Sequence, residues 1–196
     1  MQKFIKRNYH YTKRIVYTET LFNFREHLWT FIGSFLGIGI IGFLNSQYYD
    51  VYDNLFLIGS FGASSVLIYG VINSPLAQPR NLIGGHLISA FIGVLVYKLI
   101  PGQVWLSGAL SVSLSIVLMQ ITKTLHPPGG ATALIANLPS AKIQALGFFY
   151  VVSPVLSGVL ILLIVALICN NVTKNRSYPH NKSWYKIWQR KNRYTS

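Results

Sequence analysis

The sequence VWLSGALSVSLSIVLMQIT, residues 104–122, contains no charged side chain. A helix needs about 20 residues to cross the hydrocarbon core of a bilayer. Five stretches have this character, and they run near Leu28–Asn45, Leu55–Ile72, Leu82–Ile100, Val104–Thr122 and Ile143–Asn170. Backbone polar groups in lipid must be satisfied internally, and no alternating barrel strands are present. The sequence therefore predicts an all-α, polytopic transmembrane helical bundle with about 4–6 membrane-crossing elements.

The composition excludes a soluble protein. Of the 196 residues, 52% are hydrophobic and 11% are charged, whereas a soluble domain carries about 25% charged residues. The length leads us to expect one compact membrane unit without a separate catalytic domain. The lone cysteine, Cys169, excludes an internal disulfide, and its place in an apolar run indicates a packing role.

The charge distribution is strongly asymmetric. The acidic residues are Glu19, Glu26, Asp50 and Asp53. The first 18 residues hold five Lys or Arg and no acid, and residues 171–196 hold seven and no acid. Such basic flanks are typical of cytoplasmic orientation signals that contact anionic lipid headgroups, so nucleic acid is not the expected partner despite a net charge of +13.

Three regions follow from this pattern: a basic N-terminal tail and interfacial segment (1–27), a transmembrane domain (28–172) and a basic C-terminal tail (173–196). Met1–Thr18 is also compatible with an organelle transit peptide, although it has almost no Ser. The stripe Trp184–Trp188 fits either a short helix on the membrane surface or a disordered basic tail.

The two basic tails conflict with the number of apolar stretches. The positive-inside rule places both termini on the cytoplasmic side, which requires an even number of crossings. Five stretches give an odd number. Either one stretch fails to cross, or the segment between Lys123 and Lys142 crosses in an irregular form or dips in and returns.

Two segments are broken by proline and glycine. The first is NSPLAQPRNLIGGH, residues 73–86, and the second is KTLHPPGGAT, residues 123–132. Each supplies prolines, a basic residue, a Gly-Gly pair and a histidine, and the two Gly-Gly pairs are 45 residues apart, which hints at an internal duplication. Broken helices at corresponding positions of two halves are a pointer to the binding site of a transporter.

These residue types favour an anion. Helices beginning after Gly85 and Gly130 would present free N–H groups at the positive end of the helix dipole. No Asp or Glu follows Asp53, so a cation would find no carboxylate ligand, whereas a histidine could still move a proton. The candidate substrate-binding residues are His126, Pro127, Pro128, Gly129, Gly130, Thr132, Arg80, Asn81, Gly84, Gly85, His86 and Lys123.

Other interpretations apply to single residues. Arg80 and Lys123 also fit topology markers at the cytoplasmic interface, and His86 also fits a hydrogen-bonded helix residue. Two histidines without cysteine or carboxylate partners make a poor metal site, so neither a metal nor another cofactor is expected. No nucleotide fingerprint or nucleophile elbow is present, and the protein is not expected to be an enzyme.

Three motifs resemble a known family. LHPPGGATALIA (125–136) looks like the signature of the HPP family of integral membrane proteins, and FGASS (61–65) and SPLAQPRNLIGGH (74–86) also match segments of that family. The resemblance covers about residues 28–172. It implies about four transmembrane helices and membrane transport, because similar chloroplast and cyanobacterial members are assigned nitrite transport.

We therefore expect transport of a small anion, with nitrite preferred, at a site near His126, Arg80 and His86. The alternative is a non-transporting membrane assembly or scaffold protein whose basic tails recruit other components. We expect a multi-pass protein of the bacterial inner membrane, or of an organelle or plasma membrane in a eukaryote. A homo-oligomer is left open.

Overall fold

The computed structural model describes residues 24–180. The segments Met1–Thr18 and Trp184–Trp188, for which the sequence allows alternative interpretations, lie outside the described residues. The helices are α2 (Phe24–Ser46), α3 (Val51–Ser65), α4 (Pro79–Leu99), α5 (Val104–Thr122), α6 (Pro128–Ile135), α7 (Ala141–Leu146) and α8 (Ser157–Cys169), with short helical turns η1 (Val66–Gly70), η2 (Pro75–Ala77) and η3 (Val151–Leu156).

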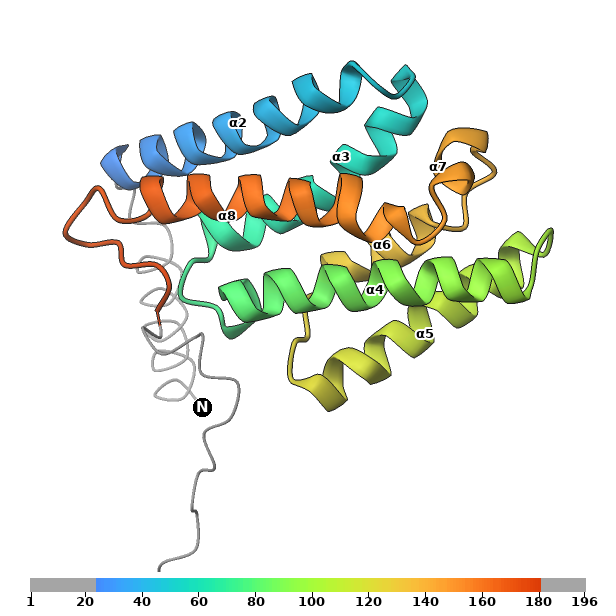
Figure 1. Ribbon diagram of the computed structural model, residues 1–196. Coiled ribbons are helices and arrows are strands. Elements are labelled where there is room, and N and C mark those ends of the chain that lie inside the picture. The colour runs from blue at the N-terminus through green and yellow to red at the C-terminus, as the bar shows by residue number, and fades with distance from the viewer. Residues whose placement is uncertain (1–23, 181–196) are drawn as a thin grey trace, which may run out of the picture.

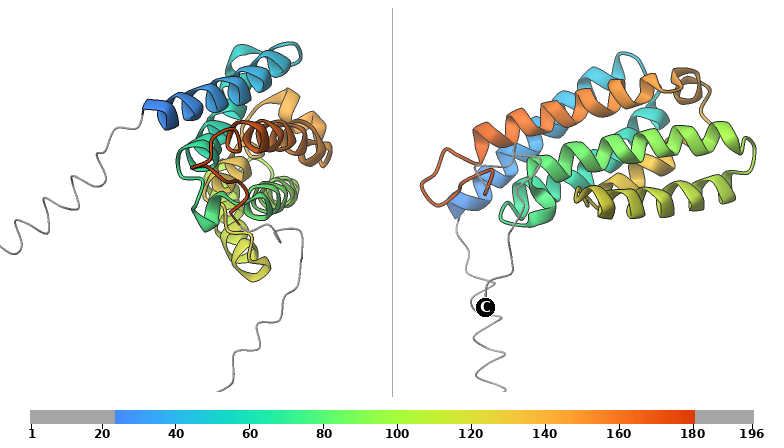
Figure 2. Two further views of the ribbon diagram at one scale, coloured as in Figure 1. Left: turned by 90° about the vertical axis from the view of Figure 1, so that its left-hand side faces the viewer. Right: turned by 60° about the horizontal axis from the view of Figure 1, so that its bottom comes forward.

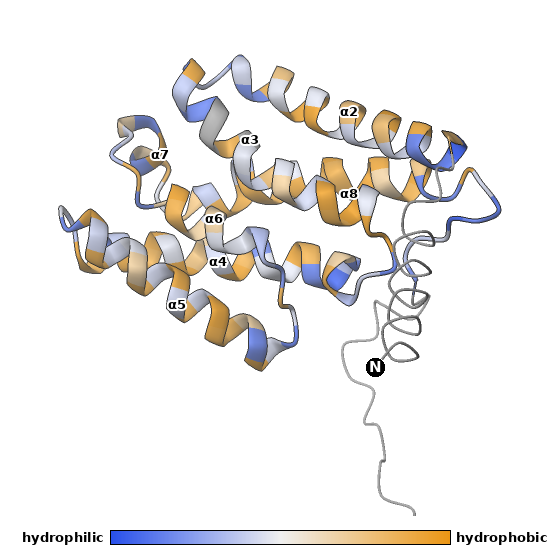
Figure 3. Ribbon diagram, turned by 180° about the vertical axis from the view of Figure 1, so that it is seen from behind, coloured by the Kyte–Doolittle hydropathy of each residue, from blue (hydrophilic) through white to orange (hydrophobic). Residues whose placement is uncertain are grey.

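Within residues 24–180, five helical units are long and apolar enough to cross a membrane, which confirms the predicted polytopic helical bundle. They are α2, α3 with η1, α4, α5, and η3 with α8. Apolar residues cover these helices, whereas hydrophilic residues gather at the turns between them (Figure 3). The protein is an integral, multi-pass membrane protein.

The last predicted stretch, Ile143–Asn170, is not one continuous helix. The short α7 ends at Gly147, whose φ of +50° lies in the left-handed region that glycine adopts most readily. The membrane-crossing unit runs over Val151–Cys169, and the backbone is non-helical at Ser153, next to Pro154. Proline removes a backbone donor and interrupts the helix there.

The helices lie side by side along one long axis (Figures 1 and 2). In Figure 1, α2 lies on one side of the molecule, α8 and α3 come next, and α5 lies on the opposite side. Helix α4 runs through the middle and packs against both α5 and α6, while α6 also packs against α3 and α5. The short α6 is thus enclosed by three longer helices.

The bundle has two ends. The Arg176 end is formed by residues 66–80, 122–125 and 170–180, where Arg176 donates to the Tyr69 carbonyl at 2.7 Å. The Asp53 end is formed by residues 46–54, 99–104 and 136–150, where the Ser140 hydroxyl donates to an Asp53 carboxylate oxygen at 2.8 Å. The start of α2 and the end of the described chain both lie at the Arg176 end, because Glu26 pairs with Arg176 and the His180 N–H donates to the Gln78 side chain at 2.9 Å. Figure 1 shows both parts of the chain at this end of the bundle.

The segment from Lys123 to Lys142 connects these two ends. At its start, Arg80 and Asn81 of α4 bond to the backbone carbonyls of Thr122 and Leu125 at the Arg176 end. By Ser140 the chain has reached the Asp53 end. Helix α6 has only eight residues, a length of about 12 Å, so an extended stretch and a short helix together make the sixth passage. With this irregular passage added to the five apolar helical units, both ends of the described segment, residues 24–180, lie at the same end of the bundle.

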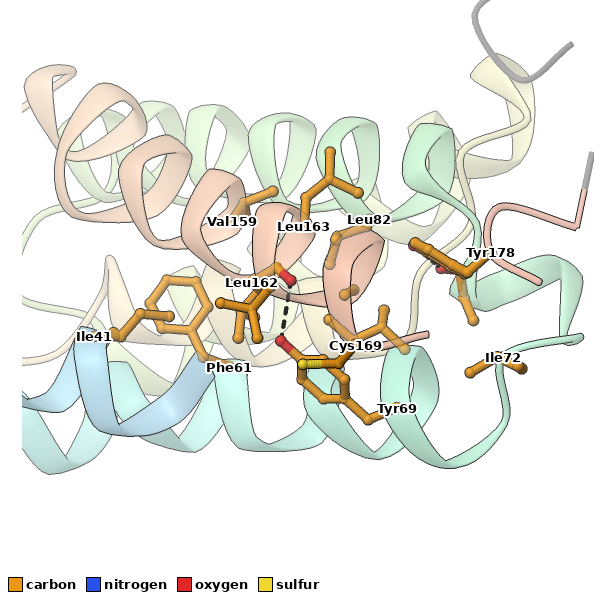
Figure 4. Close-up of a cluster of buried hydrophobic side chains, with 14 residues drawn as sticks. Ile41, Phe61, Tyr69, Ile72, Leu82, Val159, Leu162, Leu163, Cys169 and Tyr178 are labelled. Carbon is orange, nitrogen blue, oxygen red and sulfur yellow. Dashed lines mark hydrogen bonds between the residues drawn. The ribbon is translucent and has the colours of Figure 1, made fainter. Parts of the chain in front are cut away.

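The largest apolar core lies between α2, α3, η1 and α8 (Figure 4). Tyr69 is fully buried in it, and its hydroxyl donates to the Leu162 carbonyl at 3.0 Å. Gly33 and Gly37 of α2 lie against the Tyr69 ring, where an added Cβ would come within 2.7 Å and 2.5 Å of the tyrosine. Glycine at these two positions lets α2 approach Tyr69 closely, as small residues do at helix interfaces in membranes.

Part of the predicted C-terminal tail is built into the bundle. Arg176 is buried and lies 3.5 Å from a Glu26 carboxylate oxygen, and it donates to Asn170 at 2.6 Å as well as to the Tyr69 carbonyl. The buried Tyr178 hydroxyl donates to the Ala77 carbonyl at 2.7 Å. Burial raises the pKa of this hydroxyl, so it remains a donor. Residues 173–180 therefore belong to the packed domain.

Candidate functional site

The two Pro/Gly-broken segments meet inside the bundle. Asn81, in the first turn of α4, donates to the Leu125 carbonyl at 2.7 Å. In return His126 bonds through Nδ1 to the Leu76 carbonyl at 2.9 Å. Each segment thus satisfies a backbone group of the other, which holds the residues between α5 and α6 against the start of α4.

The glycine pairs do not begin helices, and this part of the sequence prediction is wrong. Helix α4 begins at Pro79, ahead of Gly84 and Gly85, and α6 begins at Pro128, ahead of Gly130. The Gly129 and Gly130 N–H groups already donate to the carbonyls of His126 and Pro127, at 2.9 and 3.0 Å. Proline takes the first helical position in both cases because its missing N–H and fixed φ suit that position.

The glycines instead allow close contact between α4 and the second broken segment. A Cβ on Gly85 would collide with the His126 side chain, and a Cβ on Gly129 would lie 2.7 Å from the Ser89 hydroxyl. A Cβ on Gly84 would lie 2.5 Å from the Thr124 side chain. Gly130 differs, since its nearest neighbour would be Val112 at 3.8 Å. Three of the four glycines therefore position His126 against α4.

The centre of this contact is a cluster of His86, His126, Ser64 and Thr132, each nearly or fully excluded from the surface. The Ser64 hydroxyl oxygen lies 2.7 Å from His86 Nε2 and 3.0 Å from His126 Nε2. His86 Nδ1 lies 2.7 Å from the Thr132 hydroxyl. The cluster therefore joins α3, α4, α6 and the stretch before α6 through side-chain hydrogen bonds.

In the uncharged cluster, only one set of hydrogen-bond directions gives every ring nitrogen a partner. A backbone carbonyl only accepts, so His126 Nδ1 carries the hydrogen that reaches Leu76. In a neutral ring Nε2 then accepts, and Ser64 must donate to it. The single Ser64 hydrogen is thereby used, so His86 Nε2 donates to Ser64 and His86 Nδ1 accepts from Thr132. Every group in the chain is satisfied.

Ser64 has a second acceptor within reach. Its hydroxyl lies 3.1 Å from the Ser60 carbonyl, one helical turn earlier in α3. If the hydroxyl hydrogen points there, both Nε2 atoms can donate to Ser64, provided that His126 carries one more proton. The cluster thus has two fully bonded arrangements that differ by one proton and by the direction of one hydroxyl.

Few charged groups lie near the cluster. The groups facing the rings are the Ser64 hydroxyl, the Thr132 hydroxyl, the Leu76 carbonyl and the Phe61 ring, whose centroid is 5.6 Å from that of His86. Within residues 24–180, no acidic or basic side chain bonds to either ring. The acids of this part of the chain lie at the ends: Glu26 at the Arg176 end, and Asp50 and Asp53 at the Asp53 end.

The remaining candidates lie outside the cluster. Arg80 donates to the Thr122 carbonyl at 2.8 Å, at the Arg176 end. Lys123 is exposed and ends α5 with a left-handed backbone, φ 56°. Pro127 is exposed, whereas Pro128 is buried. Among residues 24–180 no group of three or more His, Cys, Asp or Glu side chains could hold a metal ion.

Ser64 is the functional candidate that reasoning from residue chemistry misses. Serines are common in apolar helices, where they ordinarily bond back to the preceding turn. The available signal is that Ser64 lies within the FGASS motif at residues 61–65. That motif lies on α3, and only the fold brings it to the two histidines.

Comparisons with known proteins agree that this is a transmembrane protein. The family model described as "HPP, transmembrane region" matches residues 19–179. One transmembrane protein of Dictyostelium discoideum is 47% identical over 156 residues, which cover 77% of this chain and 49% of the relative. A second from the same organism is 49% identical over 158 residues, covering 77% and 54%. The chain spans about half the length of these curated relatives, whose names state only that they are transmembrane proteins. No solved structure matches the chain.

Proposed function

Because the chain belongs to the HPP family of integral membrane proteins, we propose that it transports a small inorganic anion across the membrane, with nitrite the leading candidate. The choice of nitrite rests on the resemblance to chloroplast and cyanobacterial members of the family. The choice of an anion rests on the chemistry of the buried cluster.

One observation carries the proposal: the Nε2 atoms of His86 and His126 converge on one oxygen atom, that of Ser64, at 2.7 and 3.0 Å. If Ser64 turns aside and both Nε2 atoms carry a hydrogen, the same two nitrogens can bind one oxygen of an anion. Hydrogen bonds to a charged acceptor are roughly twice as strong as those between neutral groups. A nitrite oxygen is a suitable acceptor for such a pair of N–H donors.

The surrounding charges support an anion over a cation. A cation in the middle of the bundle would meet no carboxylate, because Glu26, Asp50 and Asp53 lie at the two ends. Arg80 and Lys123 lie beside the broken segments at the Arg176 end and would raise the local concentration of anions there. Both residues can therefore attract the substrate without binding it in the centre.

The cluster is closed in this structure, since every ring nitrogen has a partner within the chain. Transport requires Ser64 to leave the space between the rings. The same observation favours the alternative, a non-transporting membrane scaffold in which the cluster simply ties α3, α4 and α6 together. The two functions differ in whether the chain moves an anion.

Flux measurements in liposomes test the proposal. Purified protein is reconstituted, and uptake of nitrite and of a panel of small anions is compared with uptake into protein-free liposomes. Protein-dependent nitrite uptake that is lost in His126→Ala supports the proposal. If no anion of the panel enters faster than in protein-free liposomes, anion transport is wrong and the scaffold function is favoured.

We also propose that the Arg176 end faces the cytoplasm. Both ends of the described chain lie there, and the basic flanks of the sequence follow them. Lys and Arg concentrate on the cytoplasmic side of membrane proteins and bind anionic headgroups. The basic tails would then anchor this end to the cytoplasmic leaflet.

A further inference from the structure

We infer that the anion moves together with one proton, which binds to His126, and that the Ser64 hydroxyl acts as the switch between the loaded and the empty site. This inference rests on the proposed anion site and adds the coupling ion to it. It follows from the hydrogen-bond directions in the cluster and from the charge that the bundle interior can hold.

The empty site holds the neutral arrangement of the cluster. The Leu76 carbonyl requires a hydrogen on His126 Nδ1, so the lone pair of His126 Nε2 faces Ser64 and takes the Ser64 hydrogen. In this state only His86 offers an N–H toward the space between the rings. A lone pair pointing at an anion would repel it. The neutral cluster is therefore a poor anion site.

One added proton converts the neutral cluster into a good anion site. The proton binds to the lone pair of His126 Nε2, and the hydrogen bond from Ser64 to that nitrogen is lost. The Ser64 hydrogen turns to the Ser60 carbonyl, which lies 3.1 Å away. Both Nε2 atoms now donate toward the same point. The cluster has gained one proton, on His126 Nε2. The Ser64 hydroxyl now donates to the Ser60 carbonyl, and both Nε2 atoms have an acceptor at the point on which they converge.

Charge neutrality then couples the two ions. His86 and His126 are both fully buried, and within residues 24–180 no acidic or basic side chain bonds to either of them. An isolated charge in the core of a membrane protein is costly, whether it is an imidazolium or an anion. A monoanion beside a protonated His126 has no net charge, so the two ions stabilise each other. One proton per monoanion is the expected ratio.

Ser64 prevents each ion from crossing alone. In the empty cluster its oxygen fills the point on which the two Nε2 atoms converge, and its hydrogen satisfies His126. Removal of the hydroxyl leaves His126 Nε2 open to a proton in the absence of the anion. Ser64→Ala should therefore conduct protons in the absence of the anion. Ser64→Thr keeps the hydroxyl and should not conduct protons under the same conditions.

The test follows nitrite and protons in the same liposomes. Wild-type protein is reconstituted with a pH-sensitive dye in the lumen, and an inward nitrite gradient is imposed at neutral pH, with protein-free liposomes as the control. We expect the lumen to acidify as nitrite enters, with one proton per nitrite, and the uptake rate to be insensitive to an imposed potassium diffusion potential. Nitrite uptake that follows the potential without acidification would overturn proton coupling but leave anion transport intact.

Three variants then test the switch in the absence of nitrite. Under an imposed pH gradient, Ser64→Ala should dissipate the gradient faster than the wild type, and Ser64→Thr should not. Ser65→Ala is the matched control, since the Ser65 hydroxyl is buried and has no hydrogen-bond partner within the described residues. If Ser64→Ala folds and holds the pH gradient as well as Ser65→Ala does, Ser64 is not the switch. If no nitrite enters with any variant or with the wild type, the proposed function itself fails, which is a different result.

Discussion

The imidazole rings of His86 and His126 lie with their centroids 5.0 Å apart and their planes tilted by 56°, with the Ser64 hydroxyl between their Nε2 atoms. His86 comes from the second turn of α4, whereas His126 comes from the extended stretch that precedes α6. Each ring is held at its other nitrogen, His86 by Thr132 and His126 by the Leu76 carbonyl. Neither ring can turn without losing a buried hydrogen bond. These bonds therefore fix the orientation of both rings and the space between their Nε2 atoms.

Removing the bridging hydroxyl should weaken the fold. In Ser64→Ala, His126 Nε2 loses its donor and His86 Nε2 loses its acceptor in the protein interior. A buried group left without a partner costs about 1–3 kcal/mol, and we expect a loss of that size in the free energy of unfolding. Thermal or denaturant unfolding in detergent measures it.

Ser65→Ala is again the control for this stability measurement. The Ser65 hydroxyl has no hydrogen-bond partner within the described residues, so its removal leaves no other group unpaired and should not lower the free energy of unfolding. Equal stability of the two variants would show that the Ser64 bridge contributes nothing.

His126 should be essential for flux but not for insertion into the membrane. His126→Ala removes both ring nitrogens, and nitrite uptake should fall to the level of protein-free liposomes. His126→Asn can still donate near the position of Nδ1 toward the Leu76 carbonyl but has no counterpart of Nε2. It should therefore be more stable than His126→Ala and equally inactive, as judged by unfolding and by uptake. Nitrite uptake by either variant at the wild-type rate would show that the site lies elsewhere.

Gly85 and Gly130 should respond very differently to the same substitution. A Cβ on Gly85 collides with His126 and would lie 3.0 Å from the Thr124 carbonyl, so Gly85→Ala must displace the second broken segment. Overpacking of this kind costs about 1–3 kcal/mol, and the displaced His126 should also stop nitrite uptake. Gly130→Ala meets only Val112, at 3.8 Å, and should be tolerated in both measurements. If Gly85→Ala is tolerated equally well, the contact between α4 and this segment is looser than described.

The sequence predicts the class of fold, and it singles out residues that the structure brings together, for identifiable reasons. Apolar length alone is sufficient to recognise membrane helices. The parity of the basic flanks indicates either that one apolar stretch fails to cross or that the segment between Lys123 and Lys142 crosses irregularly or dips in and returns. His86, His126 and Thr132 were recognised because polar residues next to proline and glycine are unusual in such a chain. The structure places all three in one hydrogen-bonded cluster.

Other features could not be read from the sequence because they depend on contacts between distant residues. Gly85 was expected to precede a helix, but its role is to admit His126, which is 41 positions later and adjacent only in the fold. Ser64 looked like one of many helix serines. Arg176 was counted with the basic tail, since nothing in its neighbourhood shows that it reaches the carbonyl of Tyr69.

Arg176 should be a strong stabiliser of the Arg176 end. It is 8% exposed and bonds to the Tyr69 carbonyl and to Asn170, and it forms an ion pair with Glu26. Arg176→Met keeps part of the volume but leaves these acceptors without their donor, so we expect a loss of about 3 kcal/mol in the free energy of unfolding. Lys174→Met, at an exposed position two residues earlier, is the matched control and should change little. Equal stability of the two variants would mean that residues 173–180 do not hold the domain together.

The irregular passage can be tested by the side from which single cysteines are labelled. Cys169 is the one cysteine of the chain, and Cys169→Ala gives a background without thiols. In that background, His180→Cys, Gln103→Cys and Pro139→Cys each place a thiol at an exposed position. A membrane-impermeant maleimide is applied to sealed vesicles of known orientation. Because residues 123–142 run from the Arg176 end to the Asp53 end, the thiol at 139 should be labelled from the same side as that at 103 and from the opposite side to that at 180. A segment that dipped into the membrane and returned would put positions 139 and 180 on the same side. That pattern would contradict the six-passage arrangement, and with it the buried path that brings His126 to His86.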